Sequence, residues 1–337
     1  MMAAAPPPKS APKNPIVIAH RGASGLIPEH TLAAYAKAIE DGADYIEPDL
    51  VMTKDGVLII RHENEISGTT DIAAHPEFAK RKTTKKIDGQ SVTGWFTEDF
   101  TLAELKTLRA RERLPQLRPG SAAQDGRYGI ATFQEAITLV RAREKSDKRQ
   151  IGLYPETKHS SYFKNIGLPL ESKLLSVLKA NGYSKASAPI FIQSFEVKNL
   201  QTLRTQTKLR LVQLIDDEGG PADRPDLLYA DMVKPAGLAA IALYANGIGV
   251  AKALIQPRGA DQRWTEPTSL IADAHRAGLL VHSWTFRAEN YFLPIPLRSD
   301  PNPAALGDMA SEIRHFAALG ADGVFSDHPG DAVKALR

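Results

Sequence analysis

The fold is decided by the stretch IVIAHRGASGLIPEHTLAAYAKAIEDGADYIEPDLV, which occupies residues 16–51. Its two ends, residues 16–20 and 44–51, are short runs rich in β-branched and apolar side chains, as buried strands are. Between them, residues 30–41 follow a helical pattern. A strand, a helix and a second strand in this order predict a βαβ unit around a parallel sheet.

The same alternation continues along the chain. Further strands are predicted at residues 57–62, 151–156, 189–195, 210–215, 279–286 and 323–326, with 247–250 as a ninth candidate. Further helices are predicted at residues 101–111, 132–146, 169–181, 196–207, 237–246, 266–277 and 305–319. Thr101 and Thr132 each stand three residues before a glutamate, which is the capping-box signal for a helix start. The number of units is enough to close a (β/α)8 barrel.

The connection between the third and fourth predicted strands is too long for one helix and its loops. We therefore expect one barrel over residues 15–337, with an insertion subdomain at about residues 64–130 that lies over the barrel mouth. Residues 1–14 are rich in alanine and proline and are predicted to form a flexible lead.

Composition excludes several classes of function. The 42 basic and 39 acidic residues give a net charge of +3 without a long basic block, so no nucleic-acid partner is expected. The chain has no cysteine, which excludes a thiolate nucleophile and cysteine-ligated metals. No apolar stretch approaches the roughly 20 residues of a membrane span, so no stable membrane insertion is expected. A small-molecule substrate remains.

Polar side chains stand where the first strands end, at His20, Glu47, Asp49 and His62. In an α/β barrel this edge carries the active site. Glu47 and Asp49 are two residues apart on a strand, so their side chains share a face. Glu156, at the end of the next predicted strand, adds a third carboxylate. Such a cluster predicts a Ca²⁺ or Mg²⁺ site, because these cations prefer oxygen ligands.

Alternatively, the carboxylates form a salt-bridged cluster with Lys158 or Arg21. If a metal is bound, these two cations would clamp an anionic phosphate at the same edge. His20 and His62 could then divide the proton transfers of a phosphodiester cleavage, one as base and one as acid. Taken singly, each histidine could equally be a hydrogen-bonded structural residue.

In these residues and the motifs around them, the chain resembles the glycerophosphodiester phosphodiesterase family. The resemblance rests first on Ala19-His20-Arg21-Gly22-Ala23-Ser24-Gly25, Pro28-Glu29-His30-Thr31 and Glu47-Pro48-Asp49-Leu50-Val51-Met52-Thr53-Lys54-Asp55-Gly56. It continues through His62, Glu156-Thr157-Lys158, Gln193-Ser194-Phe195, Trp284-Thr285-Phe286 and Gly323-Val324-Phe325-Ser326-Asp327. It implies a TIM barrel, Ca²⁺ or Mg²⁺ dependence, and release of glycerol 3-phosphate.

The resemblance also implies a role for each matching residue: acid/base catalysis for His20 and His62, metal binding for Glu47, Asp49 and Glu156, phosphate binding for Arg21 and Lys158, and a substrate-pocket lining for Trp284 and Phe286. The last two could equally fill the barrel core. The family resemblance leaves open whether the substrate's own glycerol hydroxyl or a water molecule attacks phosphorus. The first block and the long insertion are most similar to secreted members, so we expect a periplasmic or secreted protein.

Three positions depart from the family pattern. Pro48 stands between the two carboxylates and removes a ladder donor, so an irregular strand end is expected there. Glu63 follows His62 where the family generally has aspartate, which predicts a longer or displaced partner for the histidine. Phe286-Arg287 replaces a more usual Val-Asn or Val-Arg, and this affects the expected head-group specificity.

Two other functions remain possible from the sequence. A phospholipase-like relative on the same barrel would act on lysophospholipid, sphingomyelin or phosphatidylinositol, and residues 290–297 could form its apolar, membrane-facing rim. A non-catalytic binding protein could also reuse the barrel. That second reading predicts the loss of a histidine or carboxylate, whereas all five are present.

Overall fold

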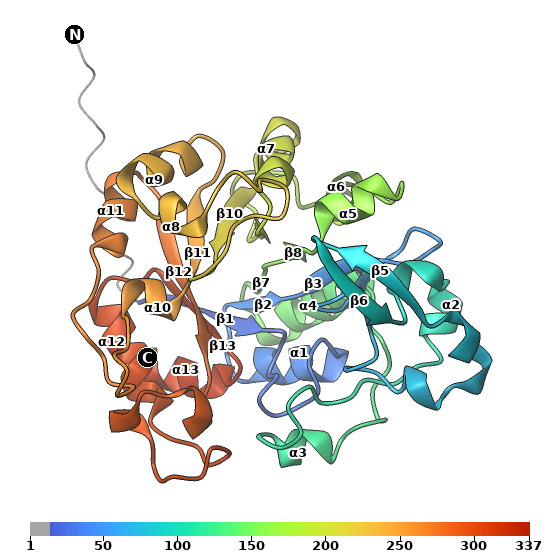
Figure 1. The fold of residues 1–337 in the computed structure, drawn as a ribbon, viewed down its shortest axis with the longest axis horizontal. Helices are drawn as coiled ribbons and strands as arrows, with labels where there is room; N and C mark the ends of the chain where they lie inside the picture. The colour runs from blue at the N-terminus through green and yellow to red at the C-terminus, as the bar shows by residue number, and fades with distance from the viewer. Residues whose placement is uncertain (1–13) are drawn as a thin grey trace.

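A computed structural model of the protein describes residues 14–337, so the lead predicted over residues 1–14 lies outside them except for Asn14. The main sheet is a closed ring of eight parallel strands, two of them interrupted (Figure 1). In chain order these are β1 (Ile16–His20), β2 with β3 (Tyr45–Glu47, Asp49–Met52), β7 with β8 (Gly152–Leu153, Glu156–Thr157), β9 (Phe191–Ser194), β10 (Arg210–Ile215), β11 (Gly247–Ala251), β12 (Leu280–Phe286) and β13 (Gly323–Ser326). The predicted TIM-type α/β barrel is confirmed.

The structure corrects the place of one predicted strand and decides that of the ninth candidate. The predicted third strand, β4 (Leu58–Ile60), runs antiparallel to β3 and lies outside the parallel ring. The short turn that joins β3 to β4 permits only this arrangement, because a parallel connection needs a crossover of a dozen or more residues. The ninth candidate is β11, which pairs with both β10 and β12. The long connection therefore follows the second parallel strand of the ring.

Prolines interrupt the second and third strands of the ring. Pro48 separates β2 from β3, and Pro155 precedes β8, because proline has no N–H to donate to the ladder. The carbonyl oxygens remain in use: the Glu156 amide donates to Pro48 at 3.0 Å, and the Gln193 amide donates to Pro155 at 2.9 Å. The irregular strand end predicted at Pro48 is thus confirmed.

Helices surround the ring (Figure 1). They are α1 (Leu32–Glu40), α4 (Phe133–Asp147), α5 (Ser160–Asn165), α6 (Leu170–Ala180), α7 (Val197–Gln206), α8 (Tyr229–Met232), α9 (Pro235–Ile241), α10 (Lys252–Ile255), α11 (Leu270–Arg276), α12 (Met309–Ala318) and α13 (Pro329–Leu336). The capping boxes predicted at Thr101 and Thr132 are both formed.

The connection between β4 and α4 holds its own small elements. These are a hairpin of β5 (Thr83–Ile87) and β6 (Gln90–Gly94), the short helices α2 (Leu102–Leu105) and α3 (Pro119–Ala122), and three 3₁₀ turns. In Figure 1 most of it lies to one side of the ring, in blue-green colours. The helix predicted over residues 101–111 ends at Leu105, because Arg109 and Ala110 form bridges to Gly129 and Thr70 instead.

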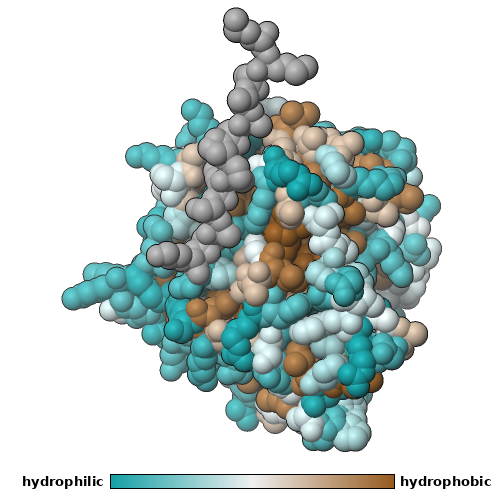
Figure 2. Space-filling model, turned by 90° about the vertical axis from the view of Figure 1, so that its left-hand side faces the viewer, coloured by the Kyte–Doolittle hydropathy of each residue, from teal (hydrophilic) through white to brown (hydrophobic). Residues whose placement is uncertain are grey.

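The surface seen in Figure 2 is mainly hydrophilic, with smaller hydrophobic areas between the polar residues. Across residues 14–337, every helix is too short or too polar to cross a membrane.

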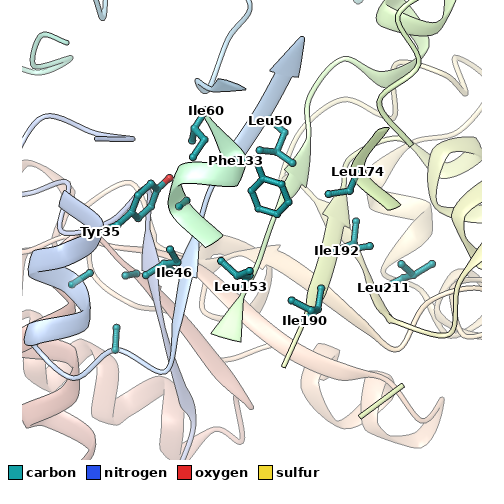
Figure 3. Packing of buried hydrophobic residues seen from close by; sticks show 14 of the residues in the cluster. Tyr35, Ile46, Leu50, Ile60, Phe133, Leu153, Leu174, Ile190, Ile192 and Leu211 are labelled. Carbon is teal, nitrogen blue, oxygen red and sulfur yellow. The ribbon is translucent and has the colours of Figure 1, made fainter. Parts of the chain in front are cut away.

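Two apolar layers fix the positions of the strand ends. The outer layer packs strand residues such as Ile46, Leu153 and Ile192 against Phe133 of α4 and Leu174 of α6, all fully buried (Figure 3). The inner layer fills the ring with Ile18, Tyr154, Phe191, Val212 and Phe325. Tyr154 stacks on Phe191 with ring centroids 5.0 Å apart, and its hydroxyl lies 2.7 Å from Nδ1 of His282. This packed floor supports the polar residues at the carboxyl ends.

Candidate active site

A pocket with an empty volume of about 440 Å³ opens at the carboxyl ends of the parallel strands. Its polar wall holds most of the residues singled out from the sequence, namely His20, Arg21, Glu47, His62, Glu156 and Lys158. Its other wall is formed largely by Phe195, Leu214, Trp284, Thr285 and Phe325. The pocket thus joins a charged side to an aromatic side, as sites for small polar molecules do.

The three carboxylates come together as the sequence predicted. One oxygen each from Glu47, Asp49 and Glu156 lies within 4.8 Å of the others, and all three residues are buried. Burial and the neighbouring carboxylates raise the pKa of Glu47 well above its usual value. Burial raises the pKa of Glu156 to about 8, although Lys158 opposes this shift. Two of the three groups are therefore costly to ionise without a further cation.

The cluster fits a hard divalent cation. Oδ1 of Asp49 is buried and has no hydrogen-bond partner among residues 14–337. A buried carboxylate oxygen without a donor is unfavourable unless a cation satisfies it. The predicted alternative, a salt-bridged cluster, is also partly present: Nζ of Lys158 lies 2.7 Å from Glu156 and 3.9 Å from Asp49. Nε of Arg21 also lies 3.7 Å from the other oxygen of Asp49, but two cations cannot neutralise three carboxylates.

Three further groups hold these carboxylates in place. His30 donates from Nε2 to Asp49 at 2.8 Å, and its Nδ1 lies 2.8 Å from the Tyr35 hydroxyl. Gln193 donates to Glu47 at 2.8 Å, and the Arg21 amide donates to the other oxygen of Glu47 at 2.9 Å. His30 was not predicted to be a site residue, although it lies in the Pro-Glu-His-Thr motif. Such supporting bonds fix the orientation of metal ligands.

His20 stands at the end of β1 and faces a buried carboxylate. Its Nδ1 lies 2.6 Å from Oδ1 of Asp327, which directly follows β13. The other oxygen of Asp327 accepts from Arg118 at 2.6 Å and from Arg287 at 2.9 Å. These cations hold the pKa of Asp327 well below its usual value, against the effect of burial.

His62 has an analogous partner in its neighbour. Its Nδ1 lies 2.5 Å from Oε1 of Glu63, so the longer side chain reaches the ring. Arg113 donates to both oxygens of Glu63, at 2.9 and 2.7 Å, and to both oxygens of Glu29, at 2.9 and 2.7 Å. Burial would raise the pKa of Glu63, but His62 and Arg113 lower it further than burial raises it.

Both imidazoles are set up alike. Ionised Asp327 and Glu63 can only accept, so Nδ1 of each histidine carries the proton. Nε2 is then the unprotonated nitrogen in each ring. Burial and the nearby Arg21 lower the pKa of His20 to about 4, and burial, Arg21 and Lys158 lower that of His62 to about 3. Without substrate, each histidine is a neutral proton acceptor at neutral pH.

Arg113 and Arg118 both come from the connection between β4 and α4, and the sequence analysis identified neither. Arg118 also donates to Glu289 at 2.5 Å and to the Ser24 carbonyl at 3.0 Å, so it joins three distant segments. No local motif marks these residues, because each acts on a partner far away in the sequence. A single segment thus supplies one arginine to the carboxylate partner of each histidine.

Of the two aromatic residues predicted to line the pocket, only Trp284 does so. Phe286 is fully buried in the outer layer, edge-on to Phe316 of α12 with ring centroids 5.1 Å apart. The pairing of β12 with β13 shifts register between Ser283 and Phe286, so the two-residue alternation fails there. The predicted pocket role of Phe286 was wrong, and Thr285 and Arg287 face the pocket instead.

Known proteins are similar to this chain in sequence and in fold. The glycerophosphoryl diester phosphodiesterase family matches residues 20–331. A glycerophosphodiester phosphodiesterase from Arabidopsis thaliana is 38% identical over 329 residues, covering 94% of this chain and 84% of the relative. Another from Haemophilus influenzae is 30% identical over 355 residues, covering 96% and 90%. A phosphodiesterase from Oleispira antarctica, solved with the product sn-glycerol-3-phosphate, shares the fold with a TM-score of 0.61 at 21% identity, covering 96% of each chain.

The barrel and these relatives define the protein as an enzyme that hydrolyses phosphoric diesters. Within that class, the chain belongs to the glycerophosphodiester phosphodiesterase family. A non-catalytic binding role is thereby set aside.

Proposed function

We propose that this enzyme uses Ca²⁺ or Mg²⁺ and two histidines to hydrolyse glycerophosphodiesters to sn-glycerol 3-phosphate and an alcohol. The observation that carries the proposal is the pairing of His20 and His62 with Asp327 and Glu63 in a pocket that also holds three carboxylates. The names of the relatives and the product bound to the Oleispira antarctica enzyme support the substrate class.

The two histidines perform the proton transfers. One takes a proton at Nε2 from the attacking hydroxyl while the new P–O bond forms, and the other gives a proton to the leaving alcohol oxygen as the old P–O bond breaks. The attacking group is either water or the substrate's glycerol hydroxyl, which would give a cyclic phosphate that water then opens. The anionic diester favours the imidazolium form that the acid needs, because it places negative charge beside the rings.

Glu47, Asp49 and Glu156 would hold the divalent cation. The bound cation supplies charge neutralisation at the phosphoryl oxygens and orients the substrate. Arg21, whose NH1 donates to Glu29 at 3.1 Å, and Lys158 would bind the phosphate from the protein side. Trp284 forms an apolar wall for the glycerol or head-group arm.

We also propose a periplasmic or secreted location, which rests on the similarity of the first sequence block and the long connection to secreted members of the family. Fractionation of the source cells with a cytosolic marker tests it: an enzyme found with that marker contradicts the proposal.

The experiment that tests the main proposal is release of glycerol 3-phosphate from glycerophosphocholine, before and after chelation with EDTA and after addition of Ca²⁺ or Mg²⁺. We expect activity to disappear on chelation and to return with the metal. Activity that is indifferent to chelation would remove the metal from the proposal, and no release under any condition would remove the substrate.

A lipid substrate is the second candidate, favoured by exposed apolar side chains in and near the loop after β12. Tyr291 is 63% exposed, Ile295 43% and Leu306 56%. Exposed side chains of this kind could contact a lipid surface. Hydrolysis of lysophosphatidylcholine in vesicles, compared with glycerophosphocholine in solution, separates the two: a Tyr291→Ser variant should lose vesicle activity alone if lipids are substrates.

A further inference from the structure

A second hollow adjoins the active-site pocket at the carboxyl ends of the strands. The two share Trp284, Thr285 and Arg287 as a common wall, and the second has an empty volume of about 940 Å³. Lys252, the first residue of α10 directly after β11, also lines the second hollow. The two hollows are therefore adjacent, with Trp284 lining both.

The charges in this hollow are arranged around one buried carboxylate. Glu312 of α12 has a side chain that is 1% exposed, and it accepts from Lys252 at 2.8 Å on each oxygen and from Arg258 at 3.1 Å. The two cations are more exposed, at 14% and 22%. Glu312 also lines the hollow, but both of its oxygens are bound by these cations, so the N–H donors are the more accessible groups.

Arg287 adds a third cation, 27% exposed, over the ring of Phe292 at 4.5 Å. Its Nε is bound to Asp327, which also binds Arg118, so the charge of Asp327 is shared. The other carboxylate that lines the hollow is Asp217, at the exposed rim. Three cations and two carboxylates line the hollow, and one of these carboxylates, Glu312, is bound to two of the cations.

This arrangement discriminates between head groups. Hydroxyl, carboxylate and phosphate oxygens accept charge-assisted hydrogen bonds from Lys252 and Arg258. A quaternary ammonium group has no acceptor, and it binds best to open aromatic faces. Here one face of Trp264 is covered by His315, whose ring is stacked 4.3 Å away. A choline group would meet exposed cations with few compensating contacts.

We propose that the hollow lined by Lys252, Arg258, Arg287 and Trp264 binds the leaving head group of the diester, and that it favours polyol or anionic head groups over choline. This proposal rests on the proposed function. The phosphate sits between the histidines, one ester arm stays against the aromatic wall of the first pocket, and the other arm passes Trp284 into the cationic hollow.

The test compares kcat/KM for glycerophosphoinositol and glycerophosphocholine in the wild type and in Arg258→Met. Glu312 keeps both contacts to Lys252 in this variant, so folding is retained. We expect a roughly 10-fold loss with glycerophosphoinositol, mainly in KM, and less than about a 2-fold change with glycerophosphocholine. Arg263→Met is the matched control, since Arg263 is 60% exposed and lies outside the lining of the hollow. This control should leave kcat/KM unchanged for both substrates.

A second variant acts in the opposite direction without touching the buried network. Asp217→Asn removes the exposed carboxylate and should lower kcat/KM for glycerophosphocholine by about 2-fold relative to glycerophosphoinositol. If the enzyme hydrolyses both substrates and neither variant changes the ratio of their kcat/KM values, the proposed subsite is overturned. The proposed function then stays intact. A wild type that cleaves neither substrate overturns both.

Discussion

The two histidines have the same chemistry in surroundings of different depth. The partner of His20, Asp327, has a side chain that is 3% exposed, and Arg118 behind it is 5% exposed. The partner of His62, Glu63, is 34% exposed, and Arg113 behind it is 29% exposed. One histidine is oriented from within the barrel, and the other by an ion pair at the surface. Two residues with equal catalytic roles can therefore have partners that contribute unequally to the stability of the fold.

Replacement of the histidines tests the equality of their roles. His20→Ala and His62→Ala should each lower kcat by about 10²- to 10⁴-fold, because each removes one proton transfer from the transition state. Steady-state release of glycerol 3-phosphate measures the effect. Near-normal turnover in either variant would remove that histidine from catalysis and break the comparison.

Replacement of the arginines tests the difference in depth. Arg118→Met should cost about 3–5 kcal/mol of unfolding free energy, because it leaves buried Glu289 without a partner and removes one of the two arginines bound to buried Asp327. Arg113→Met should cost less, about 1–2 kcal/mol, since water can reach Glu63 and Arg21 still binds buried Glu29. Urea unfolding measures both. Arg111→Met, 54% exposed in the same segment, is the control and should stay within about 0.5 kcal/mol. Equal losses of unfolding free energy in the Arg113 and Arg118 variants would contradict this explanation.

The carboxylate partners of the histidines, Asp327 and Glu63, should show the same order in their effect on kcat. Asp327→Asn should lower kcat by about 100-fold, because the amide no longer fixes the proton on Nδ1 of His20. Glu63→Gln should lower it by about 10-fold, since solvent can partly replace the lost acceptor. Kinetics at saturating substrate decide the order. A larger effect at Glu63 would show that exposure does not govern orientation here.

The cluster between the two histidines should respond to pH and metal together. Burial raises the pKa of Glu156 from 4.5 to about 8, so the folded protein keeps a proton that the unfolded chain releases. Stability without metal should therefore fall as pH rises from about 4.5 to about 8. A cation needs the ionised carboxylate, so the increase in Tm on adding Ca²⁺ should be larger at pH 8 than at pH 5. Thermal unfolding in EDTA and in Ca²⁺ measures it. An increase independent of pH would contradict the cluster as the metal site.

Much of the fold and the first layer of the site could be predicted from the sequence. The alternation of strands and helices indicates a parallel barrel, and the carboxyl ends of its strands hold His20, Glu47, Asp49 and Glu156. Those residues are local: His20 ends an apolar run, and Glu47, Asp49 and Glu156 adjoin the prolines that interrupt their strands. His62 was found in the same way, although its strand proved to be antiparallel.

The rest depends on partners distant in the sequence. Arg113 and Arg118 lie in a segment without a periodic pattern, and their function appears only when Glu63 and Asp327 are near them. Phe286 was misplaced because a register shift cannot be read from residue alternation. The ninth candidate, residues 247–250, belongs to the ring as part of β11, whereas the predicted third strand, β4, does not. Tertiary context decided each of these.

The bond between His20 and Asp327 also has a consequence for synthesis. The two residues are 307 positions apart, and Arg118 is 209 positions from Asp327. A ribosome makes His20 early and Asp327 near the end of the described chain, so the nascent polypeptide carries every proposed metal ligand before it has an oriented His20. The enzyme therefore lacks an oriented His20 until β13 and Asp327 have been made and have docked.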